Sequence, residues 1–379
     1  MNLMPLSQKP DVVFRVDASI DIGTGHVMRC LTLAEMLSAD GFSCRFICRA
    51  HKGNLTGLIR HKGFAVVELT LKEHGDNAGG LAHSHWLGVD LQTDALETMA
   101  AIGDTPSGWL IVDHYALDFR WERIVRPSCH HLMVIDDLAD RKHDCDLLLD
   151  QSLGRTENDY RLLIPDKCQV FVGAEHALLR PQFSLKRTYS LARRRQAVPQ
   201  KVLIALGGVD KDNVTERVLR ALERSALPRE AQITVVMGPH APWVNAVCEQ
   251  AARMPRKTLV VANVDDMANL MSDADLAIGA AGGTSWERCA VGVPTILMIL
   301  AENQRDVASK LAAGGAARIV ELRADFEVTL SDLVEDLLSD KAALDAMSER
   351  AAAICDGKGG LAVARQIAIR LHRQTQGIL

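Results

Sequence analysis

The 379-residue sequence predicts an α/β protein built from two Rossmann-like domains with a cleft between them. Short apolar runs alternate with helix-length amphipathic segments, a pattern typical of mainly parallel sheets covered by helices on both faces. The chain is too long for one ordinary domain and suits two. Each half also opens with a strand followed by glycines, and open α/β sheets bind ligands beyond the C-terminal ends of their strands.

The first half begins with a strand, a glycine-containing turn and a strong helix. Apolar residues recur at helical spacing through 27–39, which predicts an amphipathic helix there. Further apolar runs predict the remaining strands of one sheet. The strands expected in this half are Val12–Ala18, Ser43–Arg49, Ala65–Leu69, Trp109–Asp113, Leu132–Asp136, Leu147–Asp150 and Val170–Val172.

The alternation pauses between Pro181 and Gln200, where arginine and lysine are frequent. We interpret this run as a solvated linker or helix end, with phosphate binding as the weaker alternative. The strand pattern then restarts, and an amphipathic helix is expected at 360–372. The strands expected in the second half are Val202–Leu206, Ile233–Met237, Leu259–Val264, Leu276–Ile278, Thr295–Leu300 and Arg318–Glu321.

These patterns divide the chain into four parts. Residues 1–10 are expected to be a flexible extension, 11–190 the first domain and 200–358 the second domain. Residues 359–379 form a C-terminal helix that either packs as ordinary core or crosses back to the first domain.

Composition excludes several classes of partner. The formal net charge of −5 provides no general attraction to nucleic acid or to anionic membranes, and the 4% aromatic content argues against stacking on single-stranded nucleic acid. The nine cysteines form no Cys-x-x-Cys pair, which favours reduced thiols over a disulfide framework or a zinc site. No secretion signal or membrane span is recognised. We therefore expect a cytoplasmic monomer without metal or cofactor.

The turn after the first strand contains Gly23, Thr24, Gly25 and His26. The glycines permit unusual backbone torsions and a close approach to a ligand. The following helix start favours anions, and histidine is the side chain that titrates near neutral pH. The turn therefore predicts either proton-transfer chemistry on a phosphorylated substrate or, equally, an ordinary tight turn. The third glycine of the dinucleotide fingerprint is missing, which disfavours a nicotinamide or flavin site.

A second glycine-rich turn follows the strand at 276–278. Gly282 and Gly283 leave room for a ligand against the backbone, and Thr284 and Ser285 add hydroxyl groups. This arrangement suits a diphosphate. Glu287 lies in the first turn of the next helix, where it either accepts two ribose hydroxyls or simply complements the helix dipole.

These motifs, taken together, resemble a known group of proteins. The second half is similar to the UDP-binding half of glycosyltransferase-B-type proteins, among them the lipid II N-acetylglucosaminyltransferases. The whole chain from about Val13 onward resembles the family of UDP-2,4-diacetamido-2,4,6-trideoxy-β-L-altropyranose hydrolases of pseudaminic acid biosynthesis. The likeness rests on the segments 15–18, 22–31, 86–90, 92–94, 112–115, 135–137, 206–210, 264–267, 282–287, 292–294 and 302–304.

The resemblance implies a role for individual residues. It implies that His26 is the catalytic base and that Asn303, with Gln304, lies near the sugar. It implies that the uracil contacts the backbone around Val264. It implies that the diphosphate is bound by the turn from Gly282 to Ser285, including Gly283 and Thr284, and that Glu287 contacts the ribose. It also implies that Gly207 and Gly208 contribute to substrate binding. Val209 departs from the small polar residue that is common at this place, which leaves a hydrogen bond there in doubt.

The reaction implied is attack of water on the anomeric carbon, with His26 accepting the proton, UDP leaving and the anomeric configuration inverted. One base with a nucleotide leaving group differs from the two carboxylates of ordinary glycosidases. Asp17 either orients His26, contacts the sugar or caps the turn. His114 and Tyr115, at the end of a strand, are candidate substrate contacts, and Trp86 is interpreted as a packing residue.

Three other functions are compatible with the same motifs. A UDP-sugar-dependent glycosyltransferase would use an alcohol in place of water, and a UDP-sugar 2-epimerase would return an epimer or a glycal. A non-catalytic nucleotide-sugar-binding regulator would have no use for His26. In each case the expected partner is a small nucleotide sugar.

Overall fold

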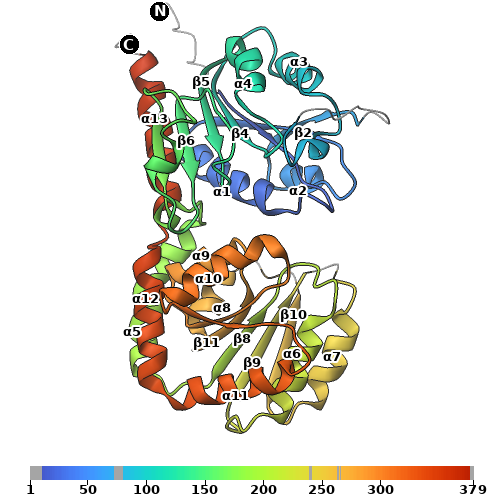
Figure 1. Ribbon diagram of the computed structural model, residues 1–379, viewed down its shortest axis with the longest axis vertical. Coiled ribbons are helices and arrows are strands. Elements are labelled where there is room, and N and C mark those ends of the chain that lie inside the picture. The colour runs from blue at the N-terminus through green and yellow to red at the C-terminus, as the bar shows by residue number, and fades with distance from the viewer. Residues whose placement is uncertain (1–10, 72–79, 239–240, 263, 265, 376–379) are drawn as a thin grey trace, which may run out of the picture. The chain divides into compact units, whose positions relative to one another are not determined.

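The computed structural model describes residues 11–71, 80–238, 241–262, 264 and 266–375, so the extension expected at 1–10 lies outside the described residues. The chain divides into two compact units. The first unit comprises the residues up to Leu179 together with Gly359–Leu379, and the second unit comprises Arg180–Lys358. Figure 1 shows the two units, each with its own sheet.

The first unit contains a parallel seven-stranded sheet in the order β3-β2-β1-β4-β5-β6-β7. Its strands are β1 (Asp11–Val16), β2 (Ser43–Arg49), β3 (Ala65–Leu69), β4 (Ser107–Asp113), β5 (Cys129–Ile135), β6 (Leu147–Asp150) and β7 (Gln169–Val172). Its α-helices are α1 (Gly25–Ala39), α2 (Thr56–His61), α3 (Leu91–Ile102), α4 (Phe119–Val125) and α13 (Gly359–Thr375). Short 3₁₀ helices are η1 (Ser84–Leu87), η2 (Arg126–Ser128), η3 (Glu157–Tyr160) and η4 (Ala174–His176).

Alternation along β1 divides the core of this unit into two layers. Val12, Phe14 and Val16 pack with α1 and α13, whereas Val13 packs with α3 and α4 on the opposite face. Both faces are apolar because a parallel sheet with helical crossovers is covered on both sides. Helix α13 returns from the far end of the sequence and joins the α1 layer through residues such as Ile367 (Figure 1).

The second unit contains a parallel six-stranded sheet in the order β10-β9-β8-β11-β12-β13. Its strands are β8 (Lys201–Ala205), β9 (Gln232–Met237), β10 (Lys257–Ala262), β11 (Leu276–Ala280), β12 (Thr295–Met298) and β13 (Ala317–Val320). Its helices are α5 (Pro181–Gln196), α6 (Val214–Arg224), α7 (Val244–Arg253), α8 (Met267–Asp273), α9 (Thr284–Ala290), η5 (Glu302–Gln304), α10 (Arg305–Ala313), α11 (Phe326–Ser339) and α12 (Lys341–Ile354).

The predicted fold class, two α/β domains with parallel sheets, is confirmed. Each strand expected from the sequence is present, with ends displaced by no more than three residues. The agreement follows from composition, because the buried strands are continuous apolar runs flanked by polar turns.

The basic segment 181–200 is not a solvated linker, and three of its arginines lie at a helix end, which was the other expectation. Residues Pro181–Gln196 form helix α5, and the division between the units lies before it, at residue 179, rather than near 190. Its arginines are held inside the second unit: Arg194 donates to the carbonyl oxygens of Ala274, Val291 and Gly292 at 2.7–3.1 Å. Helix C-terminal carbonyls lack partners within their own helix, and arginine donors can satisfy them, which explains the basic composition.

Candidate functional site

Several of the predicted site residues lie near the points where each sheet reverses its strand order, whereas Val264 follows β10 and Asn303 and Gln304 follow β12. In the first unit the reversal is between β1 and β4, and in the second it is between β8 and β11. At such a point the two crossover connections run to opposite faces of the sheet and leave room for a ligand at the C-terminal strand ends. The turn containing His26 follows β1, and the turn containing Gly282 follows β11.

The loop after β1 is held in one conformation by local bonds. The backbone N–H of Gly23 donates to Ser19 O at 2.9 Å, and the Ser19 hydroxyl accepts from the N–H groups of Asp21 and Ile22. Gly23 has a φ of +81°, in the left-handed region that strongly favours glycine. This loop delivers His26 to the first turn of α1.

The imidazole of His26 is oriented by a carboxylate that the sequence reasoning did not assign to it. His26 Nδ1 lies 2.6 Å from Asp113 Oδ1, at the end of β4, and the side chain of His26 is 10% exposed. Since an ionised carboxylate accepts hydrogen bonds, the neutral imidazole carries its hydrogen on Nδ1 and presents the lone pair of Nε2. His26 is therefore equipped to accept a proton at Nε2.

Arg29, one turn further along α1, keeps Asp113 ionised. Its Nε and Nη2 atoms donate to the two oxygens of Asp113 at 2.6 and 2.7 Å. Burial alone would raise the pKa of Asp113, but the charges and hydrogen bonds of Arg29 and His26 outweigh it and hold that pKa well below its usual range. Asp113 therefore remains a hydrogen-bond acceptor at neutral pH.

Tyr115 contacts His26 through its ring and not through its hydroxyl. The two rings meet edge to face with centroids 4.7 Å apart. The Tyr115 hydroxyl donates to Asp137 Oδ2 at 2.6 Å, an atom that also accepts from Arg29. Burial raises the pKa of Tyr115, and the neighbouring carboxylate of Asp137 adds to the effect. Tyr115 thus remains protonated at neutral pH.

Trp86 in helix η1 and His83, the residue before that helix, add two aromatic rings to this cluster. Trp86 stacks on Tyr115 with ring centroids 5.7 Å apart, and His83 lies 4.4 Å from Trp86. Trp86 therefore packs against other rings, as expected, and these rings form an aromatic group beside His26. Burial lowers the pKa of His83, which favours a neutral ring. Sequence spacing gives no signal for this grouping, since η1 and β4 are separated by helix α3.

Asp17 does not occupy the position that would orient His26. Its Oδ1 atom accepts from Arg15 Nη1 and from the backbone N–H of Arg49, both at 2.6 Å. Its Oδ2 atom lies 3.2 Å from His114 Nε2. The interpretation that Asp17 orients His26 is corrected accordingly: the carboxylate on His26 is Asp113, and Asp17 belongs to a buried ionic group.

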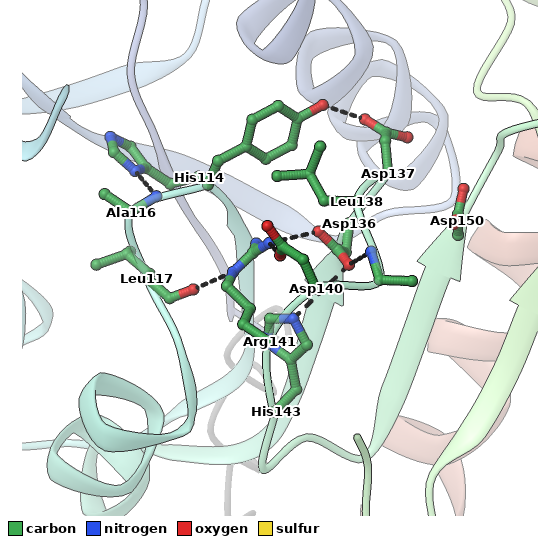
Figure 2. Close-up of polar contacts among 12 residues, drawn as sticks. His114, Ala116, Leu117, Asp136, Asp137, Leu138, Asp140, Arg141, His143 and Asp150 are labelled. Carbon is green, nitrogen blue, oxygen red and sulfur yellow. Dashed lines mark hydrogen bonds and ion pairs between the residues drawn. The ribbon is translucent and has the colours of Figure 1, made fainter. Parts of the chain in front are cut away.

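His114 lies inside the first unit rather than on an open surface. It is 3% exposed, and its Nδ1 atom accepts from the N–H of Ala116 at 3.1 Å (Figure 2). Figure 2 also shows a neighbouring buried pair, Asp136 with Arg141, at the end of β5, where Arg141 Nη1 donates to Asp136 Oδ1 at 2.8 Å. A direct substrate contact by His114 would require this region to open.

The second glycine turn is open on its outer side. A Cβ placed on Gly282 or Gly283 would meet no atom within 4 Å, and Gly283 and Thr284 are exposed. Ser285, by contrast, is 1% exposed, and its hydroxyl accepts from Arg288 Nη2 at 3.0 Å. The turn thus offers exposed backbone and one exposed hydroxyl.

Glu287 faces a partly enclosed place in the first turn of α9. Its side chain is 18% exposed, and its Oε1 atom lies 3.8 Å from Arg180 Nη2. Burial raises the pKa of Glu287, although Arg180 and Arg288 partly oppose this. A carboxylate so placed has acceptor capacity for a ligand.

The other predicted residues of the second unit have mainly structural contacts. Gly207 has a φ of +109°, and a Cβ on Gly238 would collide with Gly208 O, so the absence of a side chain at Gly238 allows the loops after β8 and β9 to meet. Gln304 accepts from the N–H of Leu300 at 3.0 Å. Val264 is half-buried, and the side chain of Asn303 lies outside the described part of the structure.

Two further findings concern metal binding and membrane-spanning helices. Across the residues that the structure describes, no group of three or more histidine, cysteine, aspartate or glutamate side chains has an arrangement suited to a metal ion. Within the same residues, no helix is long and apolar enough to cross a membrane.

Comparison with known proteins first defines the class. Residues 202–359 match the glycosyltransferase family 28 C-terminal domain, which places that domain in the second unit. The structure of MurG from Acinetobacter baumannii superposes with a TM-score of 0.69 at 17% identity, covering 95% of this chain and 99% of that one. The chain therefore has the two-domain α/β fold of glycosyltransferase-B type.

Sequence relatives then sharpen the assignment. A UDP-2,4-diacetamido-2,4,6-trideoxy-β-L-altropyranose hydrolase of Campylobacter jejuni is 24% identical over 304 residues, covering 80% of this chain and 97% of that protein. The uncharacterized protein MJ1062 of Methanocaldococcus jannaschii is 24% identical over 294 residues, which span 76% of this chain but only 56% of that protein. The resemblance to the hydrolase family is confirmed, and the similarities together indicate a nucleotide-sugar-related enzyme of the glycosyltransferase-B fold.

Proposed function

We propose that this protein hydrolyses UDP-2,4-diacetamido-2,4,6-trideoxy-β-L-altropyranose to UDP and the free sugar, as a step of pseudaminic acid biosynthesis. The observation that carries the proposal is the pair formed by His26 and Asp113, 2.6 Å apart, at the strand-order reversal of the first sheet. The similarity to the Campylobacter hydrolase supports the choice of substrate. The substrate is a single small molecule, and the protein acts as a monomer without metal or cofactor.

In the proposed reaction, a water oxygen attacks the anomeric carbon of the sugar. A proton of that water passes to His26 Nε2 as the new carbon–oxygen bond forms. Asp113, which accepts from Nδ1, stabilises the resulting imidazolium, and Arg29 holds Asp113 in place. The bond between the anomeric carbon and the diphosphate oxygen breaks, its electron pair leaves with UDP, and the anomeric configuration inverts.

The diphosphate binds, in this proposal, at the turn 282–284, where backbone and the Thr284 hydroxyl are exposed. UDP is a good leaving group, so donors at this turn are sufficient to stabilise the charge that develops on it. Glu287 accepts from the ribose hydroxyls, and the backbone at Val264 contacts the uracil. The sugar contacts are assigned to Asn303 and to the aromatic group beside His26.

Hydrolysis in ¹⁸O-labelled water tests the reaction. Label is expected in the sugar and not in UDP, as read by mass spectrometry.

His26→Gln should lower the rate of UDP release by about two to four orders of magnitude, because general base catalysis is lost, while UDP affinity stays within about twofold. His61→Gln, at the exposed end of α2, serves as the matched control. Label in UDP, or near-normal turnover by His26→Gln, would refute the mechanism.

A glycosyltransferase is the second candidate, because the matched domain is that of glycosyltransferase family 28. Here His26 would remove the proton from an acceptor alcohol rather than from water. The two candidates separate in one assay without added acceptor: a hydrolase releases free sugar carrying ¹⁸O, whereas a transferase leaves the nucleotide sugar intact. Recovery of an epimer or a glycal by NMR would instead indicate a 2-epimerase, and no turnover of any UDP-sugar would indicate a binding protein.

A further inference from the structure

We propose that Arg288 is a positioning residue for nucleotide phosphate, acting from behind the turn 282–284 of the second unit. The inference rests on the proposed function, because it takes this turn as the place where the diphosphate binds. Arg288 was not among the residues that the sequence motifs singled out, and it does not itself line the open side of the turn.

The guanidinium of Arg288 lies between the end of β11 and the first turn of α9. Nη2 donates to Ala280 O at 2.7 Å and to Ser285 Oγ at 3.0 Å, and Nη1 donates to Thr284 Oγ1 at 3.0 Å. A Cβ on Gly279 would lie 2.6 Å from Nη1, so the absence of a side chain there provides the space. Arg288 is 3% exposed.

These contacts determine what the Thr284 hydroxyl can do. A hydroxyl has one hydrogen and two lone pairs, whereas a guanidinium can only donate. Because Thr284 Oγ1 accepts from Arg288, its own hydrogen points elsewhere, and Thr284 is exposed. The turn therefore presents a hydroxyl that donates, which matches the oxygens of a diphosphate because at neutral pH they predominantly accept.

No acid is hydrogen-bonded to Arg288 among the described residues, although the nearby Glu287 carboxylate acts to raise the pKa of Arg288. Among the described residues its hydrogen-bond partners are one carbonyl and two hydroxyls, and its Nε atom, also buried, has no partner. Burial lowers the pKa of Arg288 to about 10, so the group still carries its positive charge at neutral pH. A positive charge enclosed in this way favours an anion at the adjoining turn, because screening by water is reduced.

Titration calorimetry with UDP and with uridine tests the inference on the full-length protein. Arg288→Met should weaken UDP binding about tenfold and leave uridine binding within about twofold, since uridine has no phosphate. Arg288→Lys should lie between the wild type and Arg288→Met because it keeps the charge but loses the fork geometry. Thr284→Val should lose several-fold in UDP affinity, and Thr284→Ser should restore it.

Arg194 provides a matched control in the same unit. It is 4% exposed, burial lowers its pKa to about 10 as well, and it donates to three backbone carbonyls away from the turn. Arg194→Lys should change thermal stability without weakening the binding of UDP more than the binding of uridine. Circular dichroism shows whether each variant is folded. If Arg288→Met does not fold, the UDP and uridine affinities of Arg288→Lys, Thr284→Val and Thr284→Ser test the inference instead.

Each result has a defined meaning. The inference is overturned if UDP affinity is unchanged in the Arg288 and Thr284→Val variants, or if the affinities for UDP and for uridine fall equally. Selective weakening of UDP in a protein that releases no sugar upholds the role of Arg288 and refutes the hydrolysis. If the wild type does not bind UDP, the same variants are tested with CDP, dTDP, ADP and GDP, and failure to bind any of them overturns both proposals.

Discussion

At the scale of single residues, partners matter more than residue type. His26 and Asp113 are separated by 87 positions, and neither is unusual in its local sequence. What makes His26 a candidate base is that Nδ1 is engaged by a carboxylate that Arg29 keeps ionised. His114, only one residue after Asp113, faces Asp17 instead and is buried. Asp113 is the last residue of β4 and meets His26 and Arg29 of α1, whereas His114, directly after the strand, meets Asp17.

Glu287 gives a prediction at this scale. Glu287→Gln should weaken UDP binding about tenfold and dUDP binding less, because dUDP lacks one of the two ribose hydroxyls that the carboxylate accepts. Since burial raises the pKa of Glu287, UDP affinity should fall as the pH drops toward that raised pKa and the carboxylate takes up a proton. Calorimetry at pH 7.5 and 5.5 measures both effects. Glu349→Gln, exposed on α12, is the control, and a loss equal for UDP and dUDP would argue against the ribose role.

At the scale of elements, a buried ionic group joins the strands of the first sheet to the helices on one face. Asp94 of α3 accepts from Arg15 of β1 at 2.6 Å, from Arg49 of β2 at 2.7 Å and from Trp121 of α4 at 3.0 Å. Asp17 accepts from the same Arg15. Arg15 and Arg49 lie at or next to the C-terminal ends of β1 and β2, so the group anchors β1, the strand from which the loop to His26 departs.

Asp94→Asn should destabilise the first unit by about 3–5 kcal/mol, because it leaves two buried arginines without one of their counter-charges. Burial alone would raise the pKa of Asp94, but Arg15 and Arg49 outweigh it and lower the pKa. The contribution of the carboxylate is therefore complete above its ordinary value, about pH 4, and is lost as the pH falls below that value. The difference in melting temperature between wild type and variant should shrink on going from pH 7 to pH 3.

Exposed Asp104→Asn is the control for this comparison and should melt like the wild type. A difference between wild type and Asp94→Asn that stays constant over the same pH range would show that the charge of Asp94 is not the stabilising feature.

At the scale of the whole molecule, the chain builds its first unit from both of its ends. The last helix, α13, buries Val363, Ala364, Ile367 and Leu371 in the core shared with β1 and α1. The indole N–H of Trp109 in β4 donates to Ile367 O at 3.2 Å. The second unit, 180–358, is a continuous stretch between these two parts.

A chain ending at Lys358 should therefore lose stability selectively. Removal of α13 exposes apolar side chains of which each large one contributes about 1.5–3 kcal/mol, so the transition of the first unit should fall to lower temperature. The transition of the second unit should be unchanged because its residues are all retained. Differential scanning calorimetry of the full chain and the truncated chain shows both transitions. A chain ending at Thr375 is the control, and an equal shift of both transitions would contradict the assignment of α13 to the first unit.

Local patterns in the sequence were enough to predict the strands, the helices at 27–39 and 360–372 and the two glycine turns, because apolar periodicity and glycine act over a few residues. It placed His26 in a turn at a strand end and Gly282 with Gly283 in another. The folded structure was needed to show that Asp113, not Asp17, contacts His26, that Pro181–Gln196 is a helix of the second unit, and that Arg288 lies behind the turn 282–284. The reason is physical: strand order and helix packing bring distant side chains together, and periodicity along the chain does not encode which of them meet.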